Sequence, residues 1–253
     1  MALFKSGNPA LNENIFVIAG KAAKDNRVMT LQGTVNKTAL LMMIVVFTSF
    51  YTWNLFMTTL DVARINPYVF TGIIGSLVLS VVIIIRKKWA PFLSPLHAIM
   101  QGLFLGALSA MYEYLIPGIV MQALLLTFGI LSALLIVYKL RILKPTENLK
   151  LFVVAGTAGL ALYYVANLAL SFAGIRLPFI HENSVWGILF NVFAIVMASL
   201  NLVVDFDFIE HGVDSRAPKY MEWYGAFGLM ITIIWLYIEI LSLLAKTKQK
   251  ESG

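Results

Sequence analysis

The sequence contains no cysteine, which excludes a disulfide framework and a thiolate metal site. It is also poor in charge, because Asp, Glu, Lys and Arg make up 13 % of its 253 residues, about half the share usual in soluble domains. Hydrophobic residues account for 60 %. The net charge of +6 does not indicate nucleic-acid binding, since Lys and Arg stand in short clusters between apolar runs. This composition is typical of a chain that lies in a lipid bilayer.

Seven apolar runs make up most of the chain, and each is close to the roughly 20 residues that a membrane-spanning helix requires. A soluble protein would need amphipathic helices to cover so many apolar ones, and none remain in a chain of this length. The sequence therefore predicts an all-α integral membrane protein with seven transmembrane helices in contact with the lipid bilayer. The runs are residues 39–60, 68–85, 96–116, 119–138, 151–172, 185–204 and 223–245.

These runs divide the chain into a polar N-terminal segment (1–38), a seven-helix transmembrane domain (39–245) and a short basic tail (246–253). Most Lys and Arg residues fall in alternate connecting segments, a bias typical of the cytoplasmic side. We therefore expect a cytoplasmic N-terminus. Seven complete spans would place the basic tail on the opposite side, whereas a re-entrant seventh helix would return it to the cytoplasm.

Small residues predict where helices pack closely, because association within lipid depends on close backbone approach. Gly102 and Gly106 form a small-xxx-small pattern in the third run. Gly156 and Gly159 offer a similar pattern in the fifth run. We interpret both pairs as packing faces rather than ligand-binding features.

Acidic residues inside the apolar runs are candidates for function, since a charge at the bilayer centre costs about 2.5 to 3.5 kcal/mol on insertion scales. Glu239 lies deep in the seventh run, and Asp205 and Asp207 close the sixth. Glu113 ends the third run and Glu222 opens the seventh. For Asp207 and Glu222, simple solvation at the membrane edge is an equally good interpretation.

Helical spacing places polar seams on the last two predicted helices. If the two seams face each other, Asp205 and Glu239 meet in a dry interior, where they would share one proton and act as a pH-sensitive latch. Once deprotonated, the same pair would offer hard oxygen ligands for a transient Ca²⁺ ion. The seams comprise Asn201 with Asp205 on the sixth run, and Thr232, Glu239, Ser242 and Lys246 on the seventh.

Three motifs resemble the transmembrane Bax inhibitor motif family, in particular its bacterial branch. The stretch VDFDFI at 204–209 and the stretch LYIEIL at 236–241 resemble the paired signature of the last two helices. The stretch QGLFLG at 101–106 is similar to the glycine motif of the third helix. The family usually has Asp where this chain has Glu239.

The resemblance implies six helices packed around a central seventh, a location in the bacterial inner membrane, and a calcium leak controlled by Asp205 and Glu239. It also implies a link to inhibition of a membrane protease. Direct pairing of the two acids requires that residues 221–228 form a separate segment bent at Gly225 or Gly228, or else another residue becomes the partner. Asp207 with Glu222 is the fallback pair.

Two functions therefore compete: a pH-sensitive cation leak, and a non-conducting regulator of a membrane protease or another membrane partner. A proton-coupled transporter is a weaker third. An enzyme is not expected, because the His-Glu-x-x-His and Gly-x-Gly-Asp motifs of intramembrane proteases are absent. No cofactor is predicted, and His97, His181 and His211 lack metal-ligand spacing and are expected near the membrane interfaces.

Overall fold

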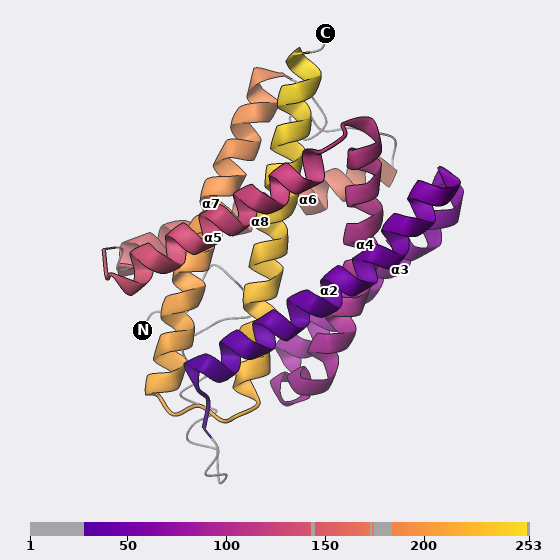
Figure 1. Ribbon diagram of the computed structural model, residues 1–253. Coiled ribbons are helices and arrows are strands. Elements are labelled where there is room, and N and C mark those ends of the chain that lie inside the picture. The colour runs from indigo at the N-terminus through magenta and orange to yellow at the C-terminus, as the bar shows by residue number, and fades with distance from the viewer. Residues whose placement is uncertain (1–27, 143–144, 173, 175–183, 252–253) are drawn as a thin grey trace. The chain divides into compact units, whose positions relative to one another are not determined.

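The computed structural model describes residues 28–142, 145–172, 174 and 184–251, and these residues are almost entirely helical (Figure 1). Seven long helices and one short 3₁₀ helix follow one another along the chain, and the described residues contain no β-strand. The predicted all-α fold is confirmed. The elements are α2 (Leu31–Thr59), α3 (Val62–Ile85), η1 (Lys87–Trp89), α4 (Ala90–Leu115), α5 (Ile119–Lys139), α6 (Glu147–Phe172), α7 (Val185–Asp214) and α8 (Met221–Glu251).

All seven helices are long and apolar enough to cross a membrane. Large apolar side chains are widely exposed on their surfaces, among them Phe47 at 75 %, Phe92 at 81 % and Leu162 at 71 %. In water such a surface would be an aggregation hazard, whereas lipid tails are as apolar as the side chains themselves. The protein is therefore an integral membrane protein.

The first and last helices extend beyond the predicted apolar runs. Helix α2 begins at Leu31, because the Thr30 side chain accepts a hydrogen bond from the Gly33 backbone N–H and caps the helix. Helix α8 begins at Met221 and continues through most of the predicted basic tail to Glu251. Most of the predicted polar segment 1–38, together with His181, lies outside the described residues.

The chain forms two compact units. The described part of the N-terminal unit comprises residues 28–117 and 209–230, and therefore holds α2, α3, η1, α4, the end of α7 and the start of α8. The described part of the C-terminal unit comprises residues 118–142, 145–172, 174, 184–208 and 231–251, and holds α5, α6 and the longer parts of α7 and α8.

Close contact between α2 and α4 organises the N-terminal unit. A methyl group at Gly102 would overlap the hydroxyl of Thr48, and one at Gly106 would overlap the carbonyl oxygen of Ser49. The Ser49 hydroxyl donates a 3.0 Å hydrogen bond to the Gly102 carbonyl oxygen across the same contact. The predicted packing role of this glycine pair is confirmed. Helix α3 approaches α4 in a similar way at Gly72, where an added methyl carbon would lie 2.7 Å from the carbonyl oxygen of Met100.

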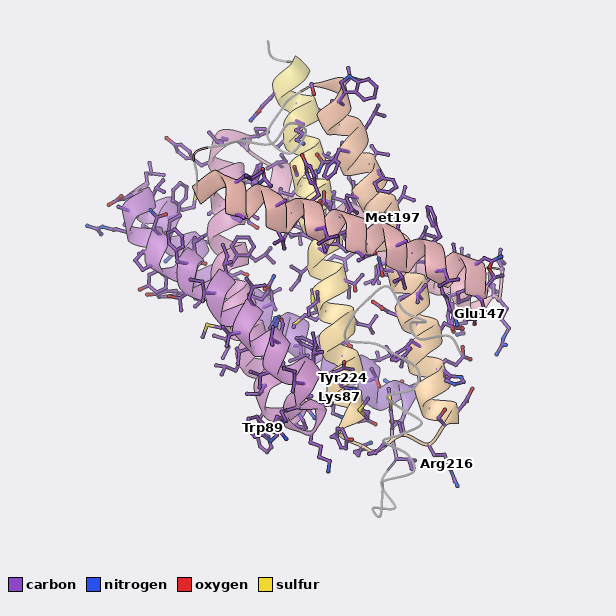
Figure 2. The ribbon with its side chains drawn as sticks, turned by 180° about the vertical axis from the view of Figure 1, so that it is seen from behind. Lys87, Trp89, Glu147, Met197, Arg216 and Tyr224 are labelled. Atoms are coloured by element: carbon purple, nitrogen blue, oxygen red, sulfur yellow. The ribbon has the colours of Figure 1, made fainter. Side chains whose placement is uncertain are left out.

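The core of the C-terminal unit lies between α6 and α7. Helix α6 contributes buried Val153 and Leu160, and α7 contributes Ala194, Met197 and Val204. Figure 2 shows Met197 beside the α6 ribbon.

The two glycines of the second predicted pair, Gly156 and Gly159 of α6, differ in their surroundings. A methyl group at Gly156 would overlap the Met197 side chain, so this glycine packs as predicted. One at Gly159 would meet nothing within 4 Å, so the packing role predicted for Gly159 is wrong.

Helix α8 is continuous from Met221 to Glu251, so residues 221–228 do not form the separate segment that direct pairing of Asp205 with Glu239 would require. Gly225 and Gly228 lie inside the helix rather than at a bend. Helix α8 also has the largest share of buried residues, 67 % of its most apolar stretch against 50 % for α7. The arrangement of six helices around a central seventh stays a prediction.

Candidate functional site: buried carboxyl groups

Asp205 lies on the buried face of α7 in the C-terminal unit, and its side chain is completely covered. Its Oδ2 atom accepts a hydrogen bond of 2.7 Å from the Thr232 hydroxyl on α8. Within this unit α7 and α8 run side by side, as Figure 1 shows. The sequence left open that a residue other than Glu239 is the partner of Asp205, and Thr232 is such a partner.

Glu239 lies on α8 in the same unit and is 5 % exposed. Its Oε1 atom accepts hydrogen bonds from the Tyr164 hydroxyl at 2.5 Å and the Trp235 indole N–H at 3.1 Å. Its Oε2 atom accepts a hydrogen bond from the Asn191 side-chain amide at 2.8 Å. Three helices thus supply three donors to one carboxyl group, an arrangement that suits an ionised carboxylate.

The hydrogen bonds described for Asp205 and Glu239 go to different residues. Thr232, which binds Asp205, stands seven residues before Glu239 on α8, a rise of about 10 Å. The described partners of the two carboxyl groups therefore lie at successive levels of α8. Their role as a gate pair stays a prediction.

The other members of the predicted polar seams lie close to these two carboxyl groups in the sequence and on the same helices. Asn201 is buried on α7 and donates to the Thr157 hydroxyl of α6 at 2.5 Å and to the Met197 carbonyl oxygen at 3.0 Å. Ser242 is half-buried on α8. Lys246 is buried and donates to the Gly187 carbonyl oxygen of α7 at 3.2 Å.

Asp207 belongs to an ion pair within the C-terminal unit. Its side chain is 30 % exposed, and its Oδ2 atom lies 2.8 Å from the ammonium of Lys150, whose side chain is 8 % exposed. Lys150 also lies 3.8 Å from Glu147, at the start of α6. Asp207 thus ties the first turns of α6 to α7.

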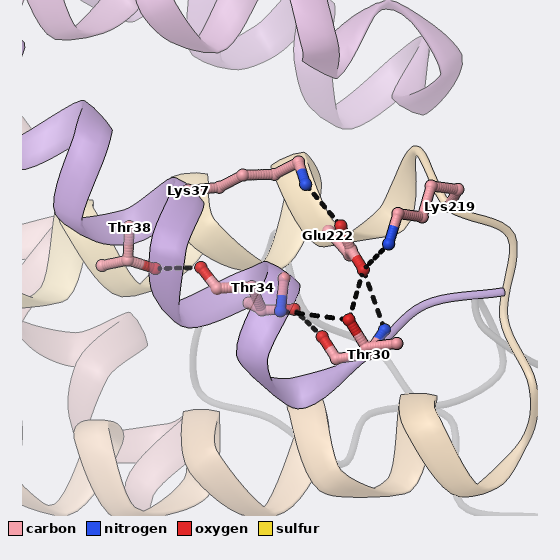
Figure 3. Close-up of polar contacts among 7 residues, drawn as sticks. Thr30, Thr34, Lys37, Thr38, Lys219 and Glu222 are labelled. Carbon is pink, nitrogen blue, oxygen red and sulfur yellow. Dashed lines mark hydrogen bonds and ion pairs between the residues drawn. The ribbon is translucent and has the colours of Figure 1, made fainter. Parts of the chain in front are cut away.

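Glu222 forms a separate polar cluster in the N-terminal unit, drawn in Figure 3. Its Oε1 atom accepts from the backbone N–H of Thr30 at 2.9 Å, the Thr30 hydroxyl at 2.8 Å and the Lys219 ammonium at 2.7 Å. Its Oε2 atom pairs with Lys37 of α2. Because Glu222 has no exposed side-chain surface, its interpretation as a solvated edge residue is wrong. The two members of the fallback pair, Asp207 and Glu222, fall in different units, and each has a lysine partner within its own unit.

Glu113, the remaining acidic candidate, lies half-buried two residues before the end of α4. His97, which we expected near a membrane interface, is buried at 2 % exposure, with its Nε2 atom 2.9 Å from the Ser80 hydroxyl oxygen. Its ring packs edge-on against Phe227, with the ring centroids 4.9 Å apart. Both of these contacts belong to the N-terminal unit.

Sequence reasoning missed several partners of the acidic residues: Thr30, Lys37, Tyr164, Asn191 and Trp235. Trp235 alone carried a usable signal, because it stands four residues before Glu239 on one helical face. No group of three or more His, Cys, Asp or Glu residues in the described parts of the chain could hold a metal ion. The predicted transient Ca²⁺ ion at Asp205 or Glu239 stays a prediction.

The family model described as Bax inhibitor 1 like matches residues 8–249, nearly the whole chain. The chain belongs to the Bax inhibitor family. Comparison with individually curated proteins found no match. In this Bax inhibitor family protein, two of the three stretches that carried the resemblance supply Asp205 and Glu239. Asp205 is completely buried and Glu239 nearly so.

The hydrogen bond from Tyr164 to Glu239 should contribute measurably to the stability of this Bax inhibitor family protein. We expect Tyr164→Phe to lower the free energy of unfolding in detergent by about 1.5 to 3 kcal/mol, the range for a bond to a charged group. Tyr114→Phe is the matched control, because it removes the same hydroxyl from a tyrosine that is exposed at the end of α4. Equal unfolding midpoints for the two variants would contradict the expected contribution.

Proposed function

We propose that this protein is a pH-sensitive cation leak, with Ca²⁺ as the transported cation, and that it acts as a conduit rather than as an enzyme. The observation that carries the proposal is the burial of Asp205 and Glu239 inside helices that are long and apolar enough to cross a membrane. Acidic groups at such positions are costly and typically mark ion pathways and proton relays.

The side chains around the two acids suit a hard cation. Oxygen atoms of carboxyl, hydroxyl and amide groups are the ligands that Ca²⁺ prefers. In the C-terminal unit they recur on three helices, in a bundle otherwise rich in apolar side chains. They belong to Thr157 and Tyr164 on α6, Asn191, Asn201 and Asp205 on α7, and Thr232 and Glu239 on α8.

Protonation supplies a control on such a pathway. A protonated carboxyl group has no charge to attract a cation, whereas an ionised one does, so the proton occupancy of Asp205 and Glu239 would set the rate of the leak.

The excess of Lys and Arg in alternate connecting segments supports a cytoplasmic N-terminus. We place the protein in the bacterial inner membrane on the resemblance to that branch of the family.

Ca²⁺ flux into dye-loaded liposomes, measured with purified protein between about pH 6 and pH 8, tests the proposal in the range where a perturbed carboxyl group would titrate. We expect flux above that of protein-free liposomes, with a pH dependence that Asp205→Asn or Glu239→Gln removes. Asp214→Asn is the matched control, because Asp214 lies exposed at the end of the same helix as Asp205.

Absence of flux from wild-type protein shown to be folded would overturn the leak. It would instead favour the non-conducting alternative, in which the protein binds and restrains a membrane protease or another membrane partner. That alternative predicts that a membrane protein co-purifies with the wild type and with both carboxyl variants.

A further inference from the structure

Lys246 is a buried lysine in the last third of α8, at 6 % exposure. A lysine near a helix end usually extends its ammonium group to the membrane surface. Lys246 instead donates a hydrogen bond of 3.2 Å to the Gly187 carbonyl oxygen of α7. Gly187 carries no side chain that could block this approach. The position of this ammonium group inside the C-terminal unit therefore requires an explanation.

Glu239 lies on the same face of α8 as Lys246, and its carboxyl group explains why a positive charge is held inside this unit. The two residues are seven positions apart, which is two helical turns, and they reach neighbouring turns of α7. Lys246 binds Gly187, and Glu239 binds Asn191 four residues further along α7. The ammonium and the carboxyl group therefore lie along the same contact between α7 and α8, where opposite charges attract. Tyr164, Asn191 and Trp235 supply the hydrogen bonds to that carboxyl group, and all three are neutral donors.

We infer that Lys246 is the internal counter-cation of Glu239 and that it sets how strongly this carboxyl group attracts a mobile divalent cation. The inference rests on the proposed function, and it adds a specificity-determining residue to the same site. A divalent cation that approaches Glu239 must do so against the repulsion of the Lys246 ammonium. Removing that charge, without removing the carboxylate, should strengthen cation binding.

Equilibrium Ca²⁺ binding to the full-length protein in detergent, measured from about pH 7 to about pH 9, tests the inference, with flux into liposomes measured in parallel. The alkaline values are needed because loss of the Lys246 charge also favours the protonated form of Glu239, which attracts no cation. We expect Lys246→Gln and Lys246→Met each to lower the half-saturating Ca²⁺ concentration about tenfold, within the range typical of coupling between two sites. Lys246→Gln retains a hydrogen-bond donor for the Gly187 carbonyl oxygen, so it separates the loss of charge from the loss of that bond. Lys246→Arg retains the charge and should restore wild-type binding.

Lys248→Met is the matched control, because Lys248 stands two positions further along α8 and therefore on a different face. It should leave the half-saturating concentration unchanged. Thermal unfolding of each variant identifies any that fail to fold, and Lys246→Gln remains informative if Lys246→Met does not fold.

Two outcomes would overturn the inference: unchanged Ca²⁺ binding by folded Lys246→Gln, or an equal shift in Lys248→Met. Tighter Ca²⁺ binding by Lys246→Gln without flux from any variant would support the counter-cation role of Lys246 while the proposed leak fails. The two failures are therefore distinguishable.

Discussion

Gly106→Leu is expected to unfold the N-terminal unit or to lower its free energy of unfolding by about 3 kcal/mol or more, the upper end of overpacking costs. A first side-chain carbon at this position would overlap the Ser49 carbonyl oxygen and the Thr52 hydroxyl, and would lie 2.6 Å from the Ser49 carbonyl carbon. Two of these three atoms belong to the α2 backbone. The clash can be relieved only if α2 and α4 move apart, since a rotamer change does not displace backbone.

Gly159→Leu is the matched control for this experiment. Gly159 also lies inside an apolar helix, but an added methyl carbon there meets nothing within 4 Å. Leu favours a helix over Gly by up to about 1 kcal/mol, so this variant should be as stable as the wild type or slightly more stable. Thermal unfolding in detergent, with size-exclusion chromatography to detect aggregation, measures both variants. If Gly106→Leu unfolds at the wild-type temperature, the close packing of α2 against α4 is wrong.

Glu222→Gln should have the next largest effect, a loss of about 3 kcal/mol in the free energy of unfolding, the lower end of the cost of breaking a buried ion pair. The substitution leaves Lys37, whose side chain is 20 % exposed, without the carboxylate that neutralises it. It also replaces the charged acceptor of Lys219 and Thr30 with a neutral amide oxygen, and it removes the negative charge that favours the positive end of the α8 dipole.

Asp61→Asn is a suitable control, because it also removes one acidic charge near a helix start. Asp61 pairs with Arg64 at 3.6 Å on the surface, with 47 % of its side chain exposed, and Asn can still cap α3. Exposed pairs of this kind contribute about 0 to 1 kcal/mol. Chemical unfolding in detergent compares the two variants.

The double variant Glu222→Leu with Lys37→Met should recover part of the stability that Glu222→Gln loses, because it buries no uncompensated charge in this pair. If Glu222→Gln loses no more stability than Asp61→Asn, the expected stabilising role of the Glu222 cluster is wrong.

The Glu222 cluster illustrates the limit of sequence reasoning at the acidic residues. Glu222 sits at the start of an apolar run, where solvation and burial predict the same sequence pattern. Its partners Thr30 and Lys37 lie 192 and 185 positions away. No spacing rule links residues so far apart. Asp205 and Glu239 were easier to identify, because a carboxyl group surrounded by apolar residues is costly wherever it occurs in the chain.

Composition and the lengths of the apolar runs were enough to predict the all-α class and the seven spanning helices. The spacing of small residues predicted the glycine contact at Gly102 and Gly106, and the resemblance of three short stretches indicated the family. That Thr232 binds Asp205, and that Tyr164 and Asn191 bind Glu239, could be learned only from the folded arrangement. The faces at which two helices meet depend on how the side chains of separate segments fit together. The pattern within one segment does not contain that information.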